Sequence, residues 1–321
     1  MAPILRTPLR LTVATIVLAA LSATVAGCSS EGAAQPAASG ASSSAVTVDG
    51  VKISVDAAAR KLVPQRYLDS AKVEVASDVP YAPFEFFTAD GSDKITGVDY
   101  DLGQAIGAKL GLAFEFKQQT FDGIIPAMQA GKFQAAMSAM TSSVARMDVL
   151  DFVDYSASGT GILVAKGNPQ RIKTFLDLCG KAVAAQSGSK QVDLVNSWQA
   201  KCSTAGKKPI ALSQFPKDSD GQLAITSGKV VASVATKPSA GYVAKSTNGG
   251  KTFQVIDDPA APTGYDSTLN GIGVVKGDKL AEAVRAALQS LMDDGTYKKI
   301  LDHYGVAGIA IPKATINGAA K

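Results

Sequence analysis

Between residues 73 and 150, apolar segments of strand length alternate three times with segments of helical periodicity. The clearest helical stripe places Leu102, Ile106 and Leu110 at helical spacing just before a glycine. A second series of short strands and helices occupies residues 174–256. Such alternation predicts a largely parallel sheet covered by helices. Because the chain has 321 residues, it is long enough for two α/β cores of this kind.

A hydroxyl-rich turn at residues 138–146 joins the end of one predicted strand to a helix expected over residues 144–150. The first turn of a helix exposes unpaired N–H groups and the positive end of the helix dipole, so it suits an anion. Thr141 adds a hydroxyl donor, and Arg146 adds a planar guanidinium that can bind both oxygens of a carboxylate. The same residues are equally compatible with a helix cap at Thr141 or Ser142 and a solvated arginine.

Ser189 lies in a similar turn at residues 186–190, where a strand of the second series leads into a helix. If the two series form units that face each other, both helix starts can point into one cleft. Ligands of open α/β sheets bind at the carboxyl ends of strands, as this arrangement requires. Small residues at 156–161 and a Pro-, Asp- and Gly-rich segment at 257–267 suit flexible crossings between the two units.

The N-terminus has the pattern of an export signal, with Arg6 and Arg10 before an apolar run at residues 11–21 that is short for a membrane span. The sequence Val-Ala-Gly-Cys that ends at Cys28 resembles the lipobox of bacterial lipoproteins, in which the cysteine is lipidated. The alternative is an ordinary secretory peptide with an incidental cysteine. Ser, Gly, Ala, Gln and Pro dominate residues 29–45, a composition typical of a flexible tether. We therefore expect the folded part to lie outside the cytoplasmic membrane, anchored to it by lipid.

Composition argues against several classes of function. Without Arg6 and Arg10 the chain has 30 basic and 28 acidic side chains, a balance that does not favour nucleic acid. The single histidine, His303, disfavours zinc sites and histidine-based catalysis, and we predict no metal and no other cofactor. In an exported protein, Cys179 and Cys202 are expected to form a disulfide that closes a loop of about 24 residues.

Several stretches, in their order and spacing, resemble the solute-binding proteins of polar amino acid ABC importers (extracellular solute-binding protein family 3). They lie between residues 73 and 305, at 76–78, 81–86, 97–102, 121–128, 138–146 and 294–297. The resemblance implies an α/β fold, a two-lobe periplasmic-binding-protein-like clamshell with two crossover strands, that closes over one small solute. It also implies an ABC permease as the membrane partner, and we expect a monomer.

This interpretation divides the chain into six segments. They are a lipoprotein signal peptide (1–27), a flexible tether (28–45), an N-terminal leader (46–71), the first part of lobe 1 (72–160), lobe 2 (161–257) and the second part of lobe 1 (258–321).

The resemblance also implies how the solute's carboxylate is held. Arg146 pairs with the α-carboxylate. Thr141 and a backbone group near Ala139 assist it from lobe 1, and Ser189 assists from lobe 2. Ser138 and Met140 line the wall of the pocket.

The side chain of the solute is expected to lie between Tyr81 and Phe121, while Asp78 meets a polar or ammonium group. A single aromatic residue is more often part of a core. Both of these follow strands in loops, however, which favours the pocket, whereas Phe84 and Phe86 are expected in the core.

One departure from the family pattern concerns the α-ammonium. The family usually has an aspartate shortly before a proline in lobe 2, and Thr236 stands there in this chain. A threonine can accept a hydrogen bond but has no negative charge to offset a desolvated ammonium. Lys190 and Lys237 lie close to these turns in the sequence and would repel an ammonium. A solute whose nitrogen is absent, alkylated or acylated, or one with a second acidic group, is therefore favoured, unless Asp78 or Glu85 supplies the charge.

The function predicted is that of an extracytoplasmic solute-binding lipoprotein of an ABC importer, which is not an enzyme. The expected ligand is a small carboxylate solute, a polar amino acid or a derivative of one. Two alternatives remain open: an exported enzyme of the same fold, similar to cyclohexadienyl dehydratase, with Asp78 or Glu85 as its acid or base, and a lipoprotein that senses a solute for a membrane partner.

Overall fold

The computed structural model describes residues 46–48, 50–89 and 91–320, all of which belong to one compact unit. The predicted signal peptide, Cys28 and the tether lie outside the described residues. None of the helices in the described part is long and apolar enough to cross a membrane.

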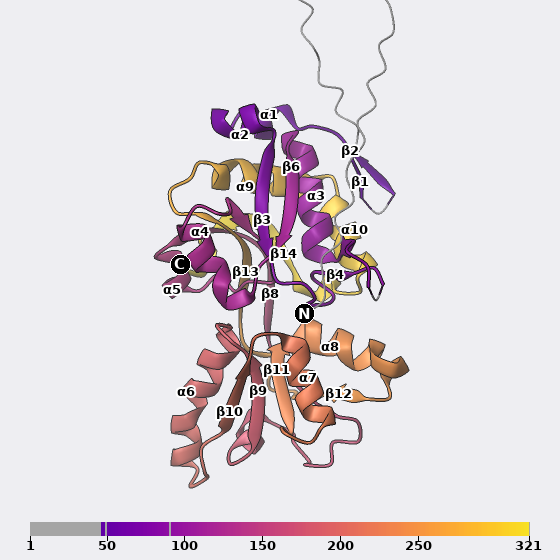
Figure 1. The fold of residues 1–321 in the computed structure, drawn as a ribbon, viewed down its shortest axis with the longest axis vertical. Coiled ribbons are helices and arrows are strands. Elements are labelled where there is room, and N and C mark those ends of the chain that lie inside the picture. The colour runs from indigo at the N-terminus through magenta and orange to yellow at the C-terminus, as the bar shows by residue number, and fades with distance from the viewer. Residues whose placement is uncertain (1–45, 49, 90, 321) are drawn as a thin grey trace, which may run out of the picture. The chain divides into compact units, whose positions relative to one another are not determined.

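One sheet runs through the whole unit in the strand order β10-β9-β11-β8-β13-β7-β3-β6, with β12 and β14 also paired to β8 (Figure 1). Its strands are β3 (Lys72–Ser77), β6 (Ala113–Gln118), β7 (Ala135–Ala136), β8 (Leu150–Ala165), β9 (Ala182–Gln186), β10 (Ala211–Phe215), β11 (Ala232–Thr236), β12 (Phe253–Val255), β13 (Tyr265–Val275) and β14 (Ala310–Ile316). The pairs β3–β6, β3–β7, β9–β10 and β9–β11 are parallel. The predicted α/β fold is confirmed.

Helices cover both ends of this sheet. They are α1 (Ala57–Arg60), α2 (Gln65–Ser70), α3 (Val98–Leu110), α4 (Ile124–Gln129), α5 (Val144–Met147), α6 (Lys190–Thr204), α7 (Asp218–Thr226), α8 (Lys237–Ser246), α9 (Leu280–Asp293) and α10 (Thr296–His303). Two small antiparallel pairs add β1 (Val46–Val48) with β2 (Val51–Ile53), and β4 (Phe86–Phe87) with β5 (Ile95–Thr96).

Two sets of hydrophobic cores define the two lobes. In lobe 1, the predicted stripe of α3 packs against α9, so that Leu102, Ile106 and Leu288 are fully buried. In lobe 2, α6 contributes Leu194 and Val195 to a separate core. The disulfide predicted between Cys179 and Cys202 is present at the edge of that core and ties α6 to the short helix before β9.

The lobes are joined by two long antiparallel strands, β8 and β13. The flexible segment expected at residues 156–161 is wrong, because these residues lie inside β8. Their small polar side chains have partners in the neighbouring strand: the Asn270 amide donates to the hydroxyls of Ser156 (3.3 Å) and Ser158 (2.9 Å). The return crossing is likewise a strand from residue 265 onward.

Glycine is required where the two crossing strands come together. A Cβ on Gly159 would lie 2.4 Å from the carbonyl carbon of Gly264, and one on Gly264 would lie 2.6 Å from that of Gly159. Any side chain at either position would push β8 and the start of β13 apart.

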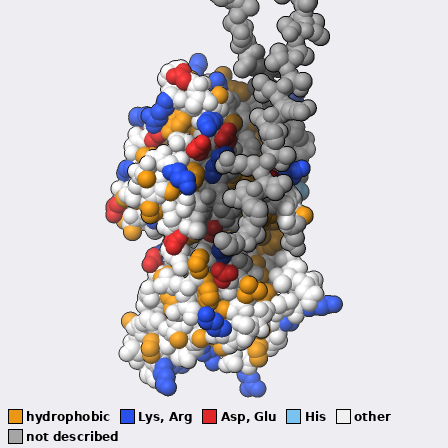
Figure 2. All heavy atoms as spheres, viewed as in Figure 1, with side chains coloured by type: hydrophobic (Ala, Val, Ile, Leu, Met, Phe, Trp, Pro, Cys, Tyr) orange, Lys and Arg blue, Asp and Glu red, His pale blue; other side chains and the backbone are white. Residues whose placement is uncertain are grey.

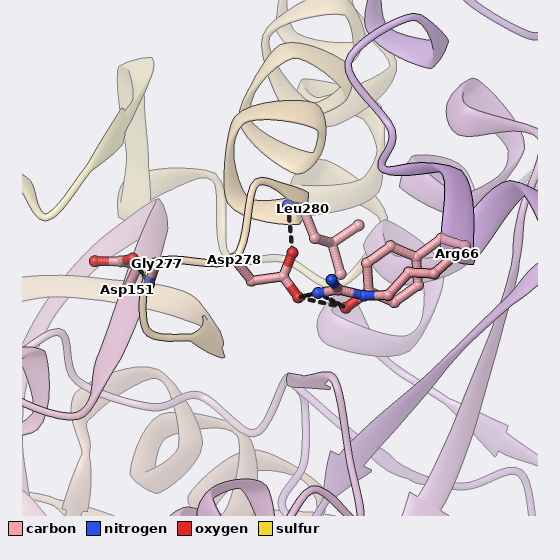
Figure 3. Close-up of polar contacts among 6 residues, drawn as sticks. Arg66, Asp151, Gly277, Asp278 and Leu280 are labelled. Carbon is pink, nitrogen blue, oxygen red and sulfur yellow. Dashed lines mark hydrogen bonds and ion pairs between the residues drawn. The ribbon is translucent and has the colours of Figure 1, made fainter.

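The segment before β3 is attached to lobe 1. Val48, Ile53 and Tyr67 join the core around α3 and α9. Asp278, just before α9, accepts hydrogen bonds from Arg66 and the Tyr67 hydroxyl with one carboxylate oxygen (Figure 3). Its other oxygen accepts the Leu280 N–H at 2.9 Å and so caps α9.

Candidate functional site

A cavity between the two lobes has about 320 Å³ of space, part of it open to solvent. Both lobes contribute to its lining, which consists of Asp78, Tyr81, Phe121, Ser138, Ala139, Thr141, Arg146, Gln186, Ser189, Lys190, Gln191 and Thr236. Nine of the ten residues that the sequence analysis assigned to ligand binding are therefore brought together in one place.

Met140 is the exception. Its side chain is buried in the core with Met128 and Phe133 and does not belong to the cavity lining. The reason is local: Ala139 adopts a positive φ of 47°, which turns the chain so that Ala139 faces the cavity and the next side chain points into lobe 1.

The Arg146 guanidinium bridges the two lobes. It donates one hydrogen bond to the Thr141 carbonyl in lobe 1 and one to the Gly188 carbonyl in lobe 2, both at 2.9 Å. It also lies over the Phe121 ring, 5.4 Å from its centre. Burial lowers the pKa of Arg146 to about 10, so the side chain remains charged at neutral pH.

The two helices that were predicted to begin at the cavity differ in length. The helix expected over residues 144–150 is only four residues long in the structure, because α5 ends at Met147 and β8 begins at Leu150. A single turn has little dipole to offer an anion. α6 is 15 residues long, and the hydroxyl of Ser189, immediately before it, is buried and makes no hydrogen bond within the described residues.

Asp78 is the acidic residue of the lining. Burial raises its pKa to about 6, against the opposing effect of the Gln186 amide, which donates to its carboxylate. The same Gln186 amide donates to the Pro216 carbonyl at 3.1 Å. The sequence analysis did not assign Gln186 or Gln191 to the site. Gln186 is the last residue of β9 and Gln191 lies in the first turn of α6, on either side of Ser189, and that neighbourhood was the available signal.

Tyr81 and Thr236 form a third direct contact between the lobes, after Arg146–Gly188 and Asp78–Gln186. The Tyr81 hydroxyl accepts a hydrogen bond from the Thr236 N–H (2.9 Å) and lies 3.0 Å from its side-chain oxygen. The polar groups of Thr236 are therefore engaged by lobe 1. Burial raises the pKa of Tyr81, so its hydroxyl remains protonated and can donate to the Thr236 oxygen.

The two lysines near these turns have different positions. Lys190 lines the cavity, with its ammonium 3.8 Å from the Asp266 carboxylate. Lys237 is outside the lining and donates to the Pro262 carbonyl at 2.9 Å. Among the residues that line the cavity, Arg146 and Lys190 are basic and Asp78 is acidic.

Two lobes joined by two crossing strands, with a cavity lined from both, define a binding protein of the periplasmic two-lobe type. Residues 73–307 match the bacterial extracellular solute-binding proteins, family 3, and the chain belongs to this family.

Relatives support the same class. The chain is 29% identical over 259 residues to the arginine-binding protein ArgT of Corynebacterium glutamicum, a match that covers 80% of this chain and 81% of that protein. An ancestral amino-acid-binding protein, described as a precursor of cyclohexadienyl dehydratase, has 31% identity and a TM-score of 0.65, covering 76% of this chain and 99% of its own. A substrate-binding protein of an amino acid ABC transporter from Streptococcus pneumoniae, bound to L-arginine, has 25% identity and a TM-score of 0.65, covering 77% and 100%.

Proposed function

We propose that this protein is the lipid-anchored, monomeric binding component of an ABC importer. It takes one small carboxylate solute, an amino acid or a derivative, into the cavity between its lobes and delivers it to a membrane permease. The observation that carries the proposal is Arg146, a partly buried cation that contacts both lobes at the cavity. The lipid anchor is inferred from Cys28 and the sequence before it.

The donors around Arg146 suit a carboxylate. A guanidinium has five N–H groups, and hydrogen bonds to protein carbonyls occupy two of them, so that others are free to bind a solute. The Ser189 hydroxyl has no partner within the described residues and lines the same cavity. A buried polar group of this kind is normally satisfied, here by the solute.

The charges of the lining narrow the class of solute. Arg146 and Asp78 line the cavity together with Lys190, whose ammonium lies 3.8 Å from the Asp266 carboxylate. Thr236, at the family's ammonium position, is already hydrogen bonded to Tyr81. We therefore favour a solute that has a net negative charge or lacks a free α-ammonium, in contrast to the arginine named for several relatives.

We propose that the protein binds its solute and does not catalyse a reaction on it. Asp78, with a pKa of about 6, is the acid of the cavity, but its carboxylate is already bound to the Gln186 amide. Glu85, the other acid considered, is fully buried and does not line the cavity. Turnover of a cyclohexadienyl acid by the purified protein would contradict this part of the proposal.

The balance of surface charge agrees with a small-molecule ligand. Figure 2 shows basic and acidic side chains on the same face, without a continuous basic patch there. Such a face does not suit the phosphate backbone of a nucleic acid.

The test begins with a thermal-shift screen of amino acids, acylated amino acids and dicarboxylates, because a ligand that binds only the folded protein raises its melting temperature. Calorimetry with the best ligand then compares the wild type with Arg146→Ala. Losing one partner of a buried charged hydrogen bond costs about 2–5 kcal/mol, or roughly 30- to 4,000-fold in affinity. The control is Arg285→Ala on α9, outside the cavity lining. Unchanged affinity in Arg146→Ala would refute the assignment.

A further inference from the structure

Two carboxyl groups lie side by side behind the cavity wall in lobe 1. Glu85 and Asp99 are both completely buried, and they are close enough for each carboxyl group to shift the pKa of the other. The titratable groups that face them are Asp78, Tyr81 and Tyr155. Neither carboxyl group has a salt bridge to a lysine or arginine within the described residues.

Asp99 accepts more hydrogen bonds than Glu85. One Asp99 oxygen accepts the Tyr155 hydroxyl (2.6 Å) and the other accepts the Ala139 N–H (2.7 Å). One Glu85 oxygen accepts the Ser138 hydroxyl at 2.7 Å. The second Glu85 oxygen is buried and receives no hydrogen bond from the described residues.

An ionised carboxyl group can only accept hydrogen bonds, whereas a protonated one can also donate. A hydrogen bond between two carboxyl groups therefore requires a proton on one of them. The oxygen of Glu85 without a donor is the atom that can carry this proton, because both oxygens of Asp99 already accept hydrogen bonds.

We propose that Glu85 holds a proton at neutral pH and donates it to Asp99, and that this proton fixes the part of the cavity wall formed by Ser138 and Ala139. Glu85 is thus a positioning residue of the binding site. The inference concerns the site of the proposed function, but its test needs no solute.

Glu85 and Asp99 form hydrogen bonds directly with residues of the cavity wall. The Ser138 hydroxyl, which donates to Glu85, accepts the backbone N–H of Asp78 at 3.0 Å. The Ala139 N–H, which donates to Asp99, belongs to a residue in the left-handed region, with φ of 47°. That conformation is unfavourable for alanine and needs such an anchor. Three residues that line the cavity therefore depend on the two carboxyl groups.

Electrostatics also favour a proton on Glu85 rather than on Asp99. Burial, followed by the charge of Asp99, raises the pKa of Glu85 well above its ordinary value. Burial also raises the pKa of Asp99, but hydrogen bonds from Ala139 and Tyr155 limit it to about 6. Two adjacent carboxyl groups without a cation cannot both ionise, and Asp99 has the donors that stabilise a negative charge.

The first measurement is infrared spectroscopy of the ligand-free protein at neutral pH. A protonated carboxyl group has a C=O stretch that is separate from the carboxylate bands. We expect a band in the wild type that shifts when the glutamate carboxyls are labelled with ¹³C, and this glutamate band should be absent in Glu85→Gln. Glutamine keeps both contacts, since its oxygen can accept from Ser138 and its amide can donate to Asp99. The matched control, Glu115→Gln on the exposed edge strand β6, should keep the band.

The second measurement is unfolding as a function of pH. Folding retains a proton that the unfolded chain releases above the ordinary pKa of glutamate. This stabilisation is complete below that pKa and is lost as pH rises through the folded pKa. Between the two, the unfolding equilibrium constant of the wild type should rise by about tenfold per pH unit relative to Glu85→Gln. Asp78 and Asp99 remain in both proteins, so the ratio reports the Glu85 proton together with any change that its loss causes in the pKa of these two neighbours.

The third measurement concerns the wall itself. In the wild type, the amide resonance of Ala139 should shift when the pH is raised far enough for Glu85 to lose its proton. In Glu85→Gln this shift should disappear. Absence of the infrared band together with parallel stability curves would overturn the inference. Because no arm uses a solute, such a result would leave the proposed solute-binding function untouched, and the failure of Arg146→Ala to affect binding would leave this inference untouched.

Discussion

The direct contact between Tyr81 and Thr236 gives a quantitative prediction about lobe closure. Tyr81→Phe removes one oxygen atom and keeps the ring, which stacks on Phe84 with ring centres 6.1 Å apart. The substitution removes the acceptor of the Thr236 N–H and the partner of its hydroxyl. Each neutral hydrogen bond contributes about 0.5–1.5 kcal/mol, so the closed form should lose about 1–3 kcal/mol relative to an open one. Solute affinity should then fall by roughly 5- to 150-fold.

The assay combines calorimetry with fluorescence. Trp198 is the single tryptophan of the chain and packs between Phe175 (4.7 Å between ring centres) and Tyr265 of the crossing strand β13 (6.0 Å). It therefore lies where lobe 2 meets the crossing strands, and its emission should report closure. In Tyr81→Phe we expect the same emission change as in the wild type, at a higher solute concentration.

A matched control exists at another contact between the lobes. Tyr242 of lobe 2 packs against Phe86 of lobe 1 with ring centres 5.7 Å apart, and no hydrogen bond of its hydroxyl is present among the described residues. Tyr242→Phe should therefore bind as tightly as the wild type. If the two phenylalanine variants bind the solute with equal affinity, the Tyr81 hydroxyl does not stabilise closure and the reasoning is refuted.

Two further predictions concern attachment, the first of the N-terminal segment to lobe 1 and the second of the protein to the membrane. Asp278→Ala removes the cap of α9 and the acceptor of the buried Tyr67 hydroxyl (Figure 3), and should lower the free energy of unfolding by about 1–3 kcal/mol in chemical denaturation, with unchanged solute affinity. Arg66→Ala, at a side chain that is 63% exposed, should cost less than about 1 kcal/mol, and an equal loss in both variants would contradict this account. Cys28→Ala should release the protein from the membrane in cell fractionation; continued attachment would show that lipidation at this residue is not the anchor.

The sequence predicts the regular parts of the fold well because burial leaves a periodic signal. The stripe of Leu102 and Ile106 identifies α3, and the turn before Ser189 identifies the start of α6, since helix periodicity and turn composition are local properties. The cavity residues follow the same logic. Most of them lie directly after strands, where the carboxyl ends of both parallel ladders meet.

The failures involve partners that are distant in the sequence. Ser156 and Ser158 look like a loop because the amide that binds their hydroxyls belongs to Asn270, more than a hundred residues away. The sequence analysis also did not predict β14, for the same reason. The hydroxyl of Thr315 donates to Asp154 of β8 at 2.7 Å, and composition alone does not reveal that pairing. The assignment of Met140 came from the family resemblance, and the positive φ of Ala139 instead turns the Met140 side chain into the core of lobe 1.

The shared sheet also determines how this protein can be recombined with its relatives. Lobe 2 is inserted between β8 and β13, so a chimera that exchanges it needs two junctions, one in each strand. Thr160 pairs with Tyr265 in the ladder, and the adjacent glycines 159 and 264 pack backbone against backbone. A donor lobe must therefore bring both junctions in that register and keep both glycines. Otherwise the grafted lobe will be joined to lobe 1 at an angle from which the two lobes cannot close over a solute.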